Sequence, residues 1–474
     1  MSRTAPGSPR IGIVGAGPGG LSLARLLTEK GFADITVIER ADRVGGKSLT
    51  VHHQGIGHEM GTCYVAVGYV TIKEWMKRAG LGEHLLHVNM IRTAKGELLD
   101  FKDFVVEPAG MIRTAAEMAR YVEHWLAFHA WDLRGGPDAL EGTRGRSMRE
   151  EVAEPFLDWL RARDLDVIER FALRTMTVMG YGSLDRVPAL YGLRWNMPSL
   201  LWSGVTMKVG EPVPGWLALW EHVAGELDVR LGHTISAVER HGAGFTVQTD
   251  QGKLDFDHLV LTGPLDEAAA WFPFTEEERA AFAVGGGALG WREYVTTLVD
   301  ASGWFRDWDT CCFEARVRDA AAVAQGQMVV ARRTGDKSAV AESRSATRPD
   351  VYVCYQYGDP RRSDEELLQT LRADLAAEGA TVNTVLRQCR WKYAPQLTTE
   401  AIRGGAVARM ERQQGRDNLW ISGATASHEA VDNIVDYNAR LAARMALSFA
   451  GADPSSDETL DAIAAEHRFT VGDK

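Results

Sequence analysis

Cysteine is scarce in this sequence and its spacing is irregular. The five cysteines, Cys63, Cys311, Cys312, Cys354 and Cys389, are odd in number and lack the spacing of metal ligands. This usage is typical of a reducing cytoplasm, so we expect a cytoplasmic protein with no metal site. We expect the thiols to be buried as small apolar side chains, with a vicinal disulfide between the adjacent pair as the less favoured alternative.

Surplus positive charge and long hydrophobic runs are also missing. The net charge of −11 argues against a nucleic-acid partner, because no basic stripe is present to displace counterions from phosphates. No uncharged apolar run reaches the roughly eighteen residues of a transmembrane segment. Residues 1–10 lack the apolar core of a secretory signal and predict a loose tail. We therefore expect a soluble protein, and its oligomeric state is not predicted.

A glycine-rich turn near the N-terminus is the strongest signal that is present. The apolar run Ile11–Val14 leads into Gly15-Ala16-Gly17-Pro18-Gly19-Gly20, and a helix-like stretch follows at once. In a dinucleotide site, Gly15 permits the tight turn, Gly17 lets the backbone approach a pyrophosphate, and Gly20 lets the helix pack on the strand. The alternative is a glycine-rich turn without a ligand.

The next strand-like stretch supports the dinucleotide interpretation. Ile35–Ile38 ends in Glu39, nineteen residues past Gly20, where a carboxylate can accept the hydroxyls of an adenosine ribose. Arg40 follows directly. A further motif, Arg43-Val44-Gly45-Gly46-Lys47, lets the chain run close along a long cofactor with cations beside its phosphates, unless it is an ordinary surface turn.

This Arg-x-Gly-Gly-Lys motif after the acidic strand end resembles the flavin amine oxidase and phytoene desaturase superfamily, which binds FAD. The resemblance implies an α/β fold with a Rossmann-like (glutathione-reductase-type) FAD-binding domain, a mixed β-sheet substrate domain and an α-helical cap. It places the FAD-binding domain at residues 1–80, 226–264 and 396–450, the substrate domain at 81–109 and 265–395, and the cap at 110–225. Residues 451–474 are expected to form a polar C-terminal appendix.

Residue patterns agree with this division. Capping boxes are predicted at Thr114 with Glu117, at Ser147 with Glu150 and at Ser363 with Glu366. A helix is predicted over 167–179, and an exposed mobile loop over 332–349.

The resemblance also implies cofactor contacts outside the phosphate loop. Beyond Pro18, Gly19 and Arg40, these predicted contacts are Gly45, Gly46, Lys47, Glu59, Met60, Gly61, Ile235, Gly423, Val431 and Asp432. Ile235 is equally well explained as part of the core. Ala424 stands where the superfamily usually has an acidic flavin contact.

Several short sequence motifs narrow the resemblance to FAD-dependent polyunsaturated fatty acid double-bond isomerases. They include Glu59-Met60-Gly61, Gly180-Tyr181-Gly182, and Tyr393 with Pro395. Amine oxidation is disfavoured, because Tyr294–Val299 lacks the usual lysine and Ser427-His428-Glu429-Ala430 replaces the C-terminal aromatic residue. His428 is not assigned a role.

The leading hypothesis is an FAD-dependent isomerase that shifts a double bond in a hydrophobic polyunsaturated substrate by hydride transfer to flavin N5 and back. The alternatives are an FAD-dependent dehydrogenase or oxidase of a lipid or secondary metabolite, and a non-catalytic flavoprotein that binds a hydrophobic ligand. The candidates for the substrate chamber are Met179, Tyr181, Tyr64 and Trp391, together with Met176, Trp195, Met197 and Trp202. Ordinary core packing is the competing interpretation for each of them.

Overall fold

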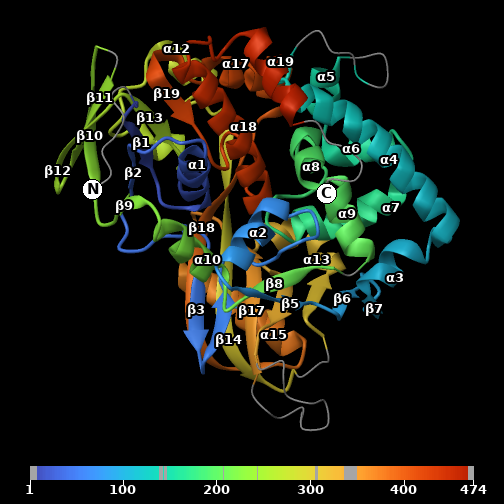
Figure 1. Ribbon diagram of the computed structural model, residues 1–474. Coiled ribbons are helices and arrows are strands. Elements are labelled where there is room, and N and C mark those ends of the chain that lie inside the picture. The colour runs from blue at the N-terminus through green and yellow to red at the C-terminus, as the bar shows by residue number, and fades with distance from the viewer. Residues whose placement is uncertain are drawn as a thin grey trace.

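The computed structural model describes residues 8–137, 142, 147–206, 208–242, 244–304, 308–335 and 350–467. Figure 1 shows a parallel sheet on the left, a long-stranded sheet at the bottom and a group of helices on the right. This arrangement confirms the predicted fold class. The domain boundaries stay predictions.

A five-stranded parallel sheet forms the nucleotide-binding part. Its order is β19-β13-β1-β2-β9. The strands are β1 (Ile11–Val14), β2 (Ile35–Ile38), β9 (Asp228–Arg230), β13 (His258–Leu261) and β19 (Leu419–Ile421). β1 and β2 are apolar apart from Thr36 and are buried along nearly their whole length, as expected for strands covered on both faces. The sheet therefore joins three distant segments of the chain.

Helices and an antiparallel meander surround this sheet. The helices are α1 (Pro18–Glu29), α10 (Trp216–Ala224), α11 (Leu265–Ala268), α12 (Glu276–Ala281), α16 (Thr399–Arg403), α17 (Ala406–Gln413), the 3-10 turn η3 (Arg416–Asn418) and α18 (Val431–Phe449). The meander consists of β10 (Ile235–His241), β11 (Gly244–Thr249) and β12 (Gly252–Phe256). α1 packs lengthwise against α18, so the first and last parts of the domain meet (Figure 1).

The substrate sheet has seven strands in the order β18-β14-β17-β16-β15-β6-β7, antiparallel except for β15 with β6. The strands are β6 (Asn89–Arg92), β7 (Leu98–Asp100), β14 (Leu289–Ser302), β15 (Thr310–Phe313), β16 (Met328–Arg333), β17 (Asp350–Tyr357) and β18 (Thr381–Leu397). The associated helices are α13 (Glu314–Arg318), α14 (Ala320–Ala324) and α15 (Asp364–Ala377). Side chains alternate between the two faces of these strands, so neighbouring residues face different parts of the molecule.

The cap is almost entirely helical. It contains α4 (Gly110–Leu133), α5 (Met148–Val152), α6 (Phe156–Arg161), α7 (Asp166–Ala172), the π-helix η1 (Leu173–Thr177), α8 (Ala189–Trp195) and α9 (Pro198–Val205). The elements that connect these parts are β3 (Thr50–His53), β4 (Ile56–Glu59), α2 (Val70–Arg78), β5 (Gly82–Leu85), α3 (Phe101–Val106), β8 (Gly210–Val213) and α19 (Asp457–Glu466).

Two of the three predicted capping boxes are present, at Ser147 and at Ser363. The box at Thr114 is wrong, because α4 begins four residues earlier and buries both Thr114 and Glu117. The Glu117 carboxylate instead accepts a hydrogen bond from the backbone N–H of Val167 at 2.8 Å. Glu117 therefore satisfies a backbone N–H at the start of α7 and does not cap its own helix.

Three further expectations are revised. The single helix expected over 167–179 is divided into α7 and η1. Arg332 and Arg333 belong to β16 and are buried, while 336–349 lie outside the described residues, as do residues 1–7 of the predicted tail. The predicted polar appendix contains α19, which packs against α18 and α4. The five cysteines are free and buried, as expected.

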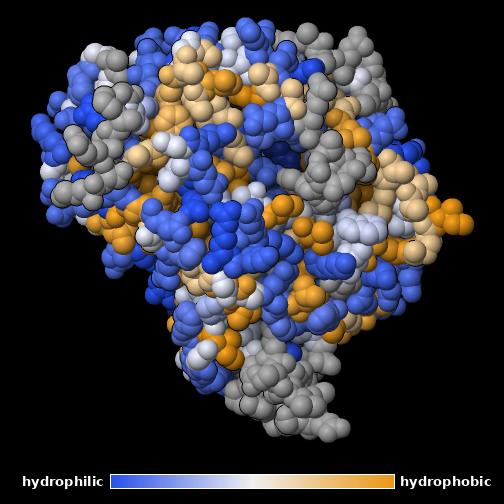
Figure 2. All heavy atoms as spheres, in the orientation of Figure 1, coloured by the Kyte–Doolittle hydropathy of each residue, from blue (hydrophilic) through white to orange (hydrophobic). Residues whose placement is uncertain are grey.

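The face shown in Figure 2 mixes hydrophilic and hydrophobic residues, with a hydrophobic projection at its right-hand edge near one end of the cap. Met111 and Ile112, in the first turn of α4, are strongly exposed. Every helix within the described ranges is too short or too polar to cross a membrane.

Candidate active site

The phosphate turn is packed so tightly that side chains would not fit. A Cβ on Gly20 would lie 1.9 Å from the carbonyl oxygen of Gly15, and one on Gly19 would lie 3.0 Å from Cα of Gly423. A Cβ on Gly46 would lie 3.1 Å from Cα of Gly17. Glycines from three distant segments therefore meet in one backbone cradle, which fits a dinucleotide that lies against backbone N–H groups.

Glu39 borders this cradle at the end of β2. Its Oε2 accepts a hydrogen bond from the N–H of Ala16 at 2.8 Å, and Oε1 accepts from Ala41 at 2.9 Å. The carboxylate is therefore fixed beside the phosphate turn, as the predicted ribose contact requires. Arg40 points outward to Glu267 at 3.3 Å and is largely exposed, so this structure shows no contact between its side chain and the cradle.

Lys47 connects the cradle to the substrate sheet. Its Nζ lies 2.6 Å from Oε1 of Glu429 and 5.4 Å from the ring centre of Tyr393. The other oxygen of Glu429 accepts a hydrogen bond from the N–H of Ala394 at 2.8 Å. The predicted phosphate-facing cation is thus engaged by a carboxylate that the sequence analysis did not single out.

The Glu59-Met60-Gly61 segment is held from two sides. Oε1 of Glu59 accepts hydrogen bonds from the N–H of Trp216 and the hydroxyl of Thr50, both at 2.9 Å, and burial raises the pKa of Glu59 to about 7. A Cβ on Gly61 would collide with the carbonyl oxygen of Lys47. Glu59 therefore anchors the segment to α10 through its side chain.

The carbonyl of Met60 faces the substrate sheet. It accepts hydrogen bonds from the hydroxyl of Thr296 at 2.6 Å and from Nε1 of Trp391 at 2.9 Å. Trp391, predicted as a chamber residue, thus holds this predicted cofactor segment. Thr296 was missed, because nothing in its local sequence distinguishes it from Thr297.

The C-terminal contacts predicted from the resemblance gather at the start of α18. Gly423 has a φ of 75° and packs on the backbone of Thr262, while Val431 and Asp432 open the helix and are buried. Asn438, which was not predicted, donates from Nδ2 to the carbonyl of Gly19 at 2.7 Å. Ile235 lies half-buried at the start of β10, so its two interpretations remain open.

Four rings contact one another here: Tyr181 and Trp195 of the cap, Tyr393 of β18, and His428 in the segment before α18. We call this cluster of four rings the aromatic chamber. Tyr181 stacks on Tyr393 with ring centres 5.6 Å apart and lies 4.6 Å from His428, which stacks on Trp195 at 5.6 Å. The sequence analysis found that Ser427-His428-Glu429-Ala430 lacks the aromatic residue of the amine oxidases. In the structure, Tyr181, Trp195 and Tyr393 supply three rings near His428 from other parts of the chain.

The remaining chamber candidates are placed differently. Met176 and Met197 are buried, and Met179 is half-buried against the same core. Tyr64 packs against the guanidinium of Arg332, 5.3 Å from its ring centre. Trp202 is 57 % exposed on α9, so the expectation that it lines an enclosed chamber is wrong.

The rings of the aromatic chamber stay neutral near pH 7. Burial raises the pKa of Tyr181 and Tyr393 and lowers the pKa of His428 to about 3. Nδ1 of His428 accepts a hydrogen bond from the N–H of Ala430 at 3.2 Å, which leaves the proton of the neutral ring on Nε2. His428 is therefore a poor general base.

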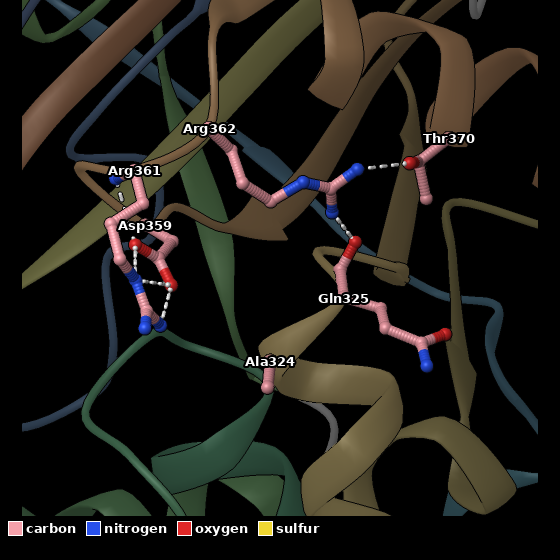
Figure 3. A pocket seen from close by; sticks show the side chains of 6 residues that line it. All are labelled: Ala324, Gln325, Asp359, Arg361, Arg362 and Thr370. Atoms are coloured by element: carbon pink, nitrogen blue, oxygen red, sulfur yellow. Dashed lines mark hydrogen bonds and ion pairs between the residues drawn. The ribbon is translucent and has the colours of Figure 1, made fainter.

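Within the described part of the chain, cavities also occur away from the four rings. One of about 300 Å³ lies between α4 and α18, where Arg194 pairs with Asp132 at 2.7 Å. Another, of about 460 Å³, is open and lies on the substrate domain (Figure 3). There Arg361 pairs with Asp359, and Arg362 bonds the carbonyl of Gln325 and the hydroxyl of Thr370.

The parallel sheet, the glycine cradle and the carboxylate of Glu39 define a dinucleotide-binding protein of the Rossmann-like class. Residues 18–287 match the family of flavin containing amine oxidoreductases, and the chain belongs to that family. It is a flavoenzyme and FAD is its cofactor.

Individual relatives are more distant. The polyenoic fatty acid isomerase of Ptilota filicina is 26% identical over 206 residues, which are 40% of this chain and 41% of that enzyme. The chain thus matches about two fifths of the length of that relative. Amine oxidase [flavin-containing] A of Sus scrofa is 33% identical over 93 residues, 19% of this chain and 18% of that enzyme. The solved structure of a CLA-producing fatty acid isomerase from P. acnes superposes with a TM-score of 0.75 and 22% identity. The superposition covers 93% of this chain and 99% of the isomerase chain.

Proposed function

We propose that this flavoenzyme is an isomerase that shifts a double bond within a hydrophobic polyunsaturated substrate. The observation that carries the proposal is the aromatic chamber, whose rings are neutral and of which Tyr181, Trp195 and His428 are buried and Tyr393 is half-buried. Such a chamber suits a reaction at an apolar carbon that exchanges no proton with the protein. Similarity to the Ptilota isomerase supports the same choice of substrate.

FAD, when bound, can accept a hydride from one carbon of a substrate and return it to another. The protein would hold the Met60 carbonyl side of the cofactor site through Thr296 and Trp391. Gly17, Gly20 and Gly46 would leave room for its phosphates, and Glu39 would receive its ribose.

The aromatic chamber would stabilise a substrate carbon that has lost a hydride. The π faces of Tyr181, Tyr393 and Trp195 are the negative side of each ring quadrupole, and this negative potential attracts a delocalised cation. Burial of the rings would keep water from adding to that carbon. A neutral His428 would not repel the cation, and it would be a weak base toward it, because burial lowers its pKa to about 3 and its Nδ1 already accepts a hydrogen bond from Ala430.

The test is anaerobic mixing of the purified holoenzyme with a panel of polyunsaturated fatty acids, with flavin absorbance and product mass followed together. Turnover to a product of unchanged mass, with no lasting bleaching of the flavin, is the expected result. A product two mass units lighter, with lasting bleaching, would overturn the isomerase proposal in favour of a dehydrogenase or oxidase. Absence of both turnover and bleaching with every substrate in the panel would also count against it.

Variants at Tyr181 test the role of the chamber. Tyr181→Phe keeps the ring and should retain turnover within about threefold, whereas Tyr181→Leu should lower kcat about tenfold or more, as expected for loss of a desolvated cation–π contact. FAD content should be normal in both. Equal kcat values for the two variants would show that the ring face does not act on the reacting carbon.

A further inference from the structure

Arg292 lies beside the aromatic chamber without a carboxylate partner. Its Nε donates to the carbonyl of Tyr181 at 3.0 Å, and Nη2 donates to Oε1 of Gln396 at 3.1 Å. Among the described residues, no Asp or Glu lies within ion-pair distance of this half-buried guanidinium. Burial lowers the pKa of Arg292, while Tyr357 raises it and Arg186 lowers it by charge repulsion. Arg292 is thus a cation whose charge no carboxylate of the described residues neutralises.

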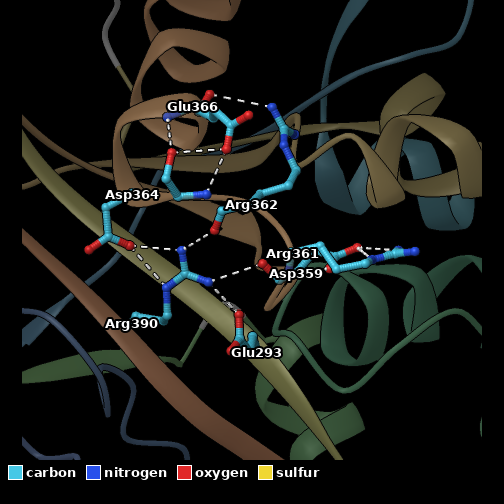
Figure 4. Close-up of polar contacts among 8 residues, drawn as sticks. Glu293, Asp359, Arg361, Arg362, Asp364, Glu366 and Arg390 are labelled. Atoms are coloured by element: carbon cyan, nitrogen blue, oxygen red, sulfur yellow. Dashed lines mark hydrogen bonds and ion pairs between the residues drawn. The ribbon is translucent and has the colours of Figure 1, made fainter.

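The direction of β14 explains this isolation. Arg292, Tyr294 and Thr296 share one face of the strand, and their side chains reach Tyr181, Val178 and Met60 respectively. Glu293 lies on the opposite face, where it pairs with Arg390 at 2.5 Å (Figure 4). Arg390 also pairs with Asp364 at 2.8 Å. Neighbouring residues thus give a neutralised cluster on one face and an uncompensated cation on the other.

The cap leaves space for this cation. Gly182 has a φ of 106°, and a Cβ there would lie 2.5 Å from the central carbon of the Arg292 guanidinium. An arginine carries five N–H donors, and the hydrogen bonds to Tyr181 and Gln396 use two of them. The remaining donors have the planar fork geometry that binds a carboxylate through two parallel hydrogen bonds.

We propose that Arg292 binds the carboxylate head group of the substrate, so that the enzyme acts on a free long-chain carboxylic acid and discriminates against its esters. This inference rests on the proposed function for the nature of the chain, but the head-group contact is separate from the chemistry. A neutral ester offers no charge to compensate Arg292 and cannot accept the same two charge-assisted bonds.

Arg174 is the competing cation. It also lacks an acidic partner among the described residues, but its Nη2 donates to Asn89 at 2.6 Å and to Thr310 at 3.0 Å, and it covers the ring of Phe101. These contacts lie on β6, β15 and α3, whereas Arg292 contacts Tyr181 of the chamber itself. The geometry therefore favours Arg292.

The experiment measures binding of dodecanoate and methyl dodecanoate to the holoenzyme from changes in flavin absorbance. Neither probe has a double bond, so the outcome is independent of whether isomerisation or oxidation follows. Arg292→Gln should raise Kd for dodecanoate about ten- to hundredfold, as expected for loss of charge-assisted hydrogen bonds, and change Kd for the ester less than twofold. Arg292→Lys should raise Kd for dodecanoate by an intermediate factor and leave Kd for the ester unchanged. If Arg292→Gln loses FAD, the Lys variant provides the test.

Matched controls separate the head-group role from a structural one. Arg390→Gln, on the opposite face of the sheet, and Arg174→Gln should leave the ratio of acid to ester Kd values unchanged. Acetate should bind at least a hundredfold more weakly than dodecanoate. The proposal is overturned if Arg292 variants weaken both probes equally or neither, if Arg174→Gln removes the selectivity, or if acetate binds as well as dodecanoate.

Discussion

Gly20→Ala tests the glycine cradle directly. Gly20 lies in the first turn of α1 with ordinary helical backbone, so alanine at this position brings no conformational strain and has the better helix propensity. Its Cβ would nevertheless lie 1.9 Å from the carbonyl oxygen of Gly15. An ordinary contact needs about 3.4 Å, so the start of α1 must retreat by about 1.5 Å from the turn.

Such a shift breaks the geometry of cofactor binding. Backbone N–H groups at the helix start bind phosphate through hydrogen bonds to a charged group, each worth about 1.5–3 kcal/mol. Loss of one or two such bonds costs about 3 kcal/mol, which raises Kd for FAD by about a hundredfold or more. The variant should therefore be purified with much less than one FAD per chain.

The assay compares flavin absorbance with protein absorbance after purification, then titrates apoprotein with FAD. Gly286→Ala is the matched control, because a Cβ there meets no atom within 4 Å and the backbone is not left-handed. It should bind FAD like the unchanged protein. The reasoning is refuted if Gly20→Ala retains stoichiometric FAD with an unchanged Kd and a normal circular dichroism spectrum.

The buried carboxyl of Glu59 should make stability depend on pH. Its pKa is raised from 4.5 to about 7 by burial, so the unfolded chain loses this proton first and the free energy of unfolding falls as pH rises through that range, by on the order of 3 kcal/mol. Glu59→Gln should flatten that slope in denaturation measured between pH 4.5 and 7.5, and an unchanged slope would assign it to other groups. Thr296→Val removes the hydroxyl that bonds Met60 and should lower the free energy of unfolding of the holoenzyme by about 1–2 kcal/mol. The Thr297 hydroxyl has only a 3.4 Å contact to the amide nitrogen of Gln388, so Thr297→Val should lower the free energy of unfolding by less. Equal decreases for the two variants in denaturant titrations would contradict the role assigned to Thr296.

Local sequence determined the elements whose partners are close along the chain. The run Ile11–Val14, the glycine turn and α1 are contiguous, and a tight turn into a helix permits few residue types other than glycine at its crowded positions. The capping boxes at Ser147 and Ser363 likewise need only residues three apart. These features could therefore be read directly, and the resemblance then supplied the order of the domains.

Only the tertiary structure decided which distant side chains meet. Glu117 has the spacing of a local cap, but the packing of α4 against α7 gives it the N–H of Val167. The aromatic chamber could not be predicted from the C-terminal segment, because three of its four rings come from elsewhere in the chain. Such contacts depend on which elements pack together, and no local pattern records that.

The two arginines of the substrate sheet show the same division. In the sequence, Arg292 precedes a glutamate directly and Arg390 lies about a hundred residues later, and the sequence analysis singled out neither of them. Pairing of β14 with β18 places Glu293 against Arg390 and leaves Arg292 on the face that meets the cap. The backbone of a strand makes successive side chains point to opposite faces of the sheet. Which face meets the cap and which meets Arg390 was decided by the elements that pack against the sheet.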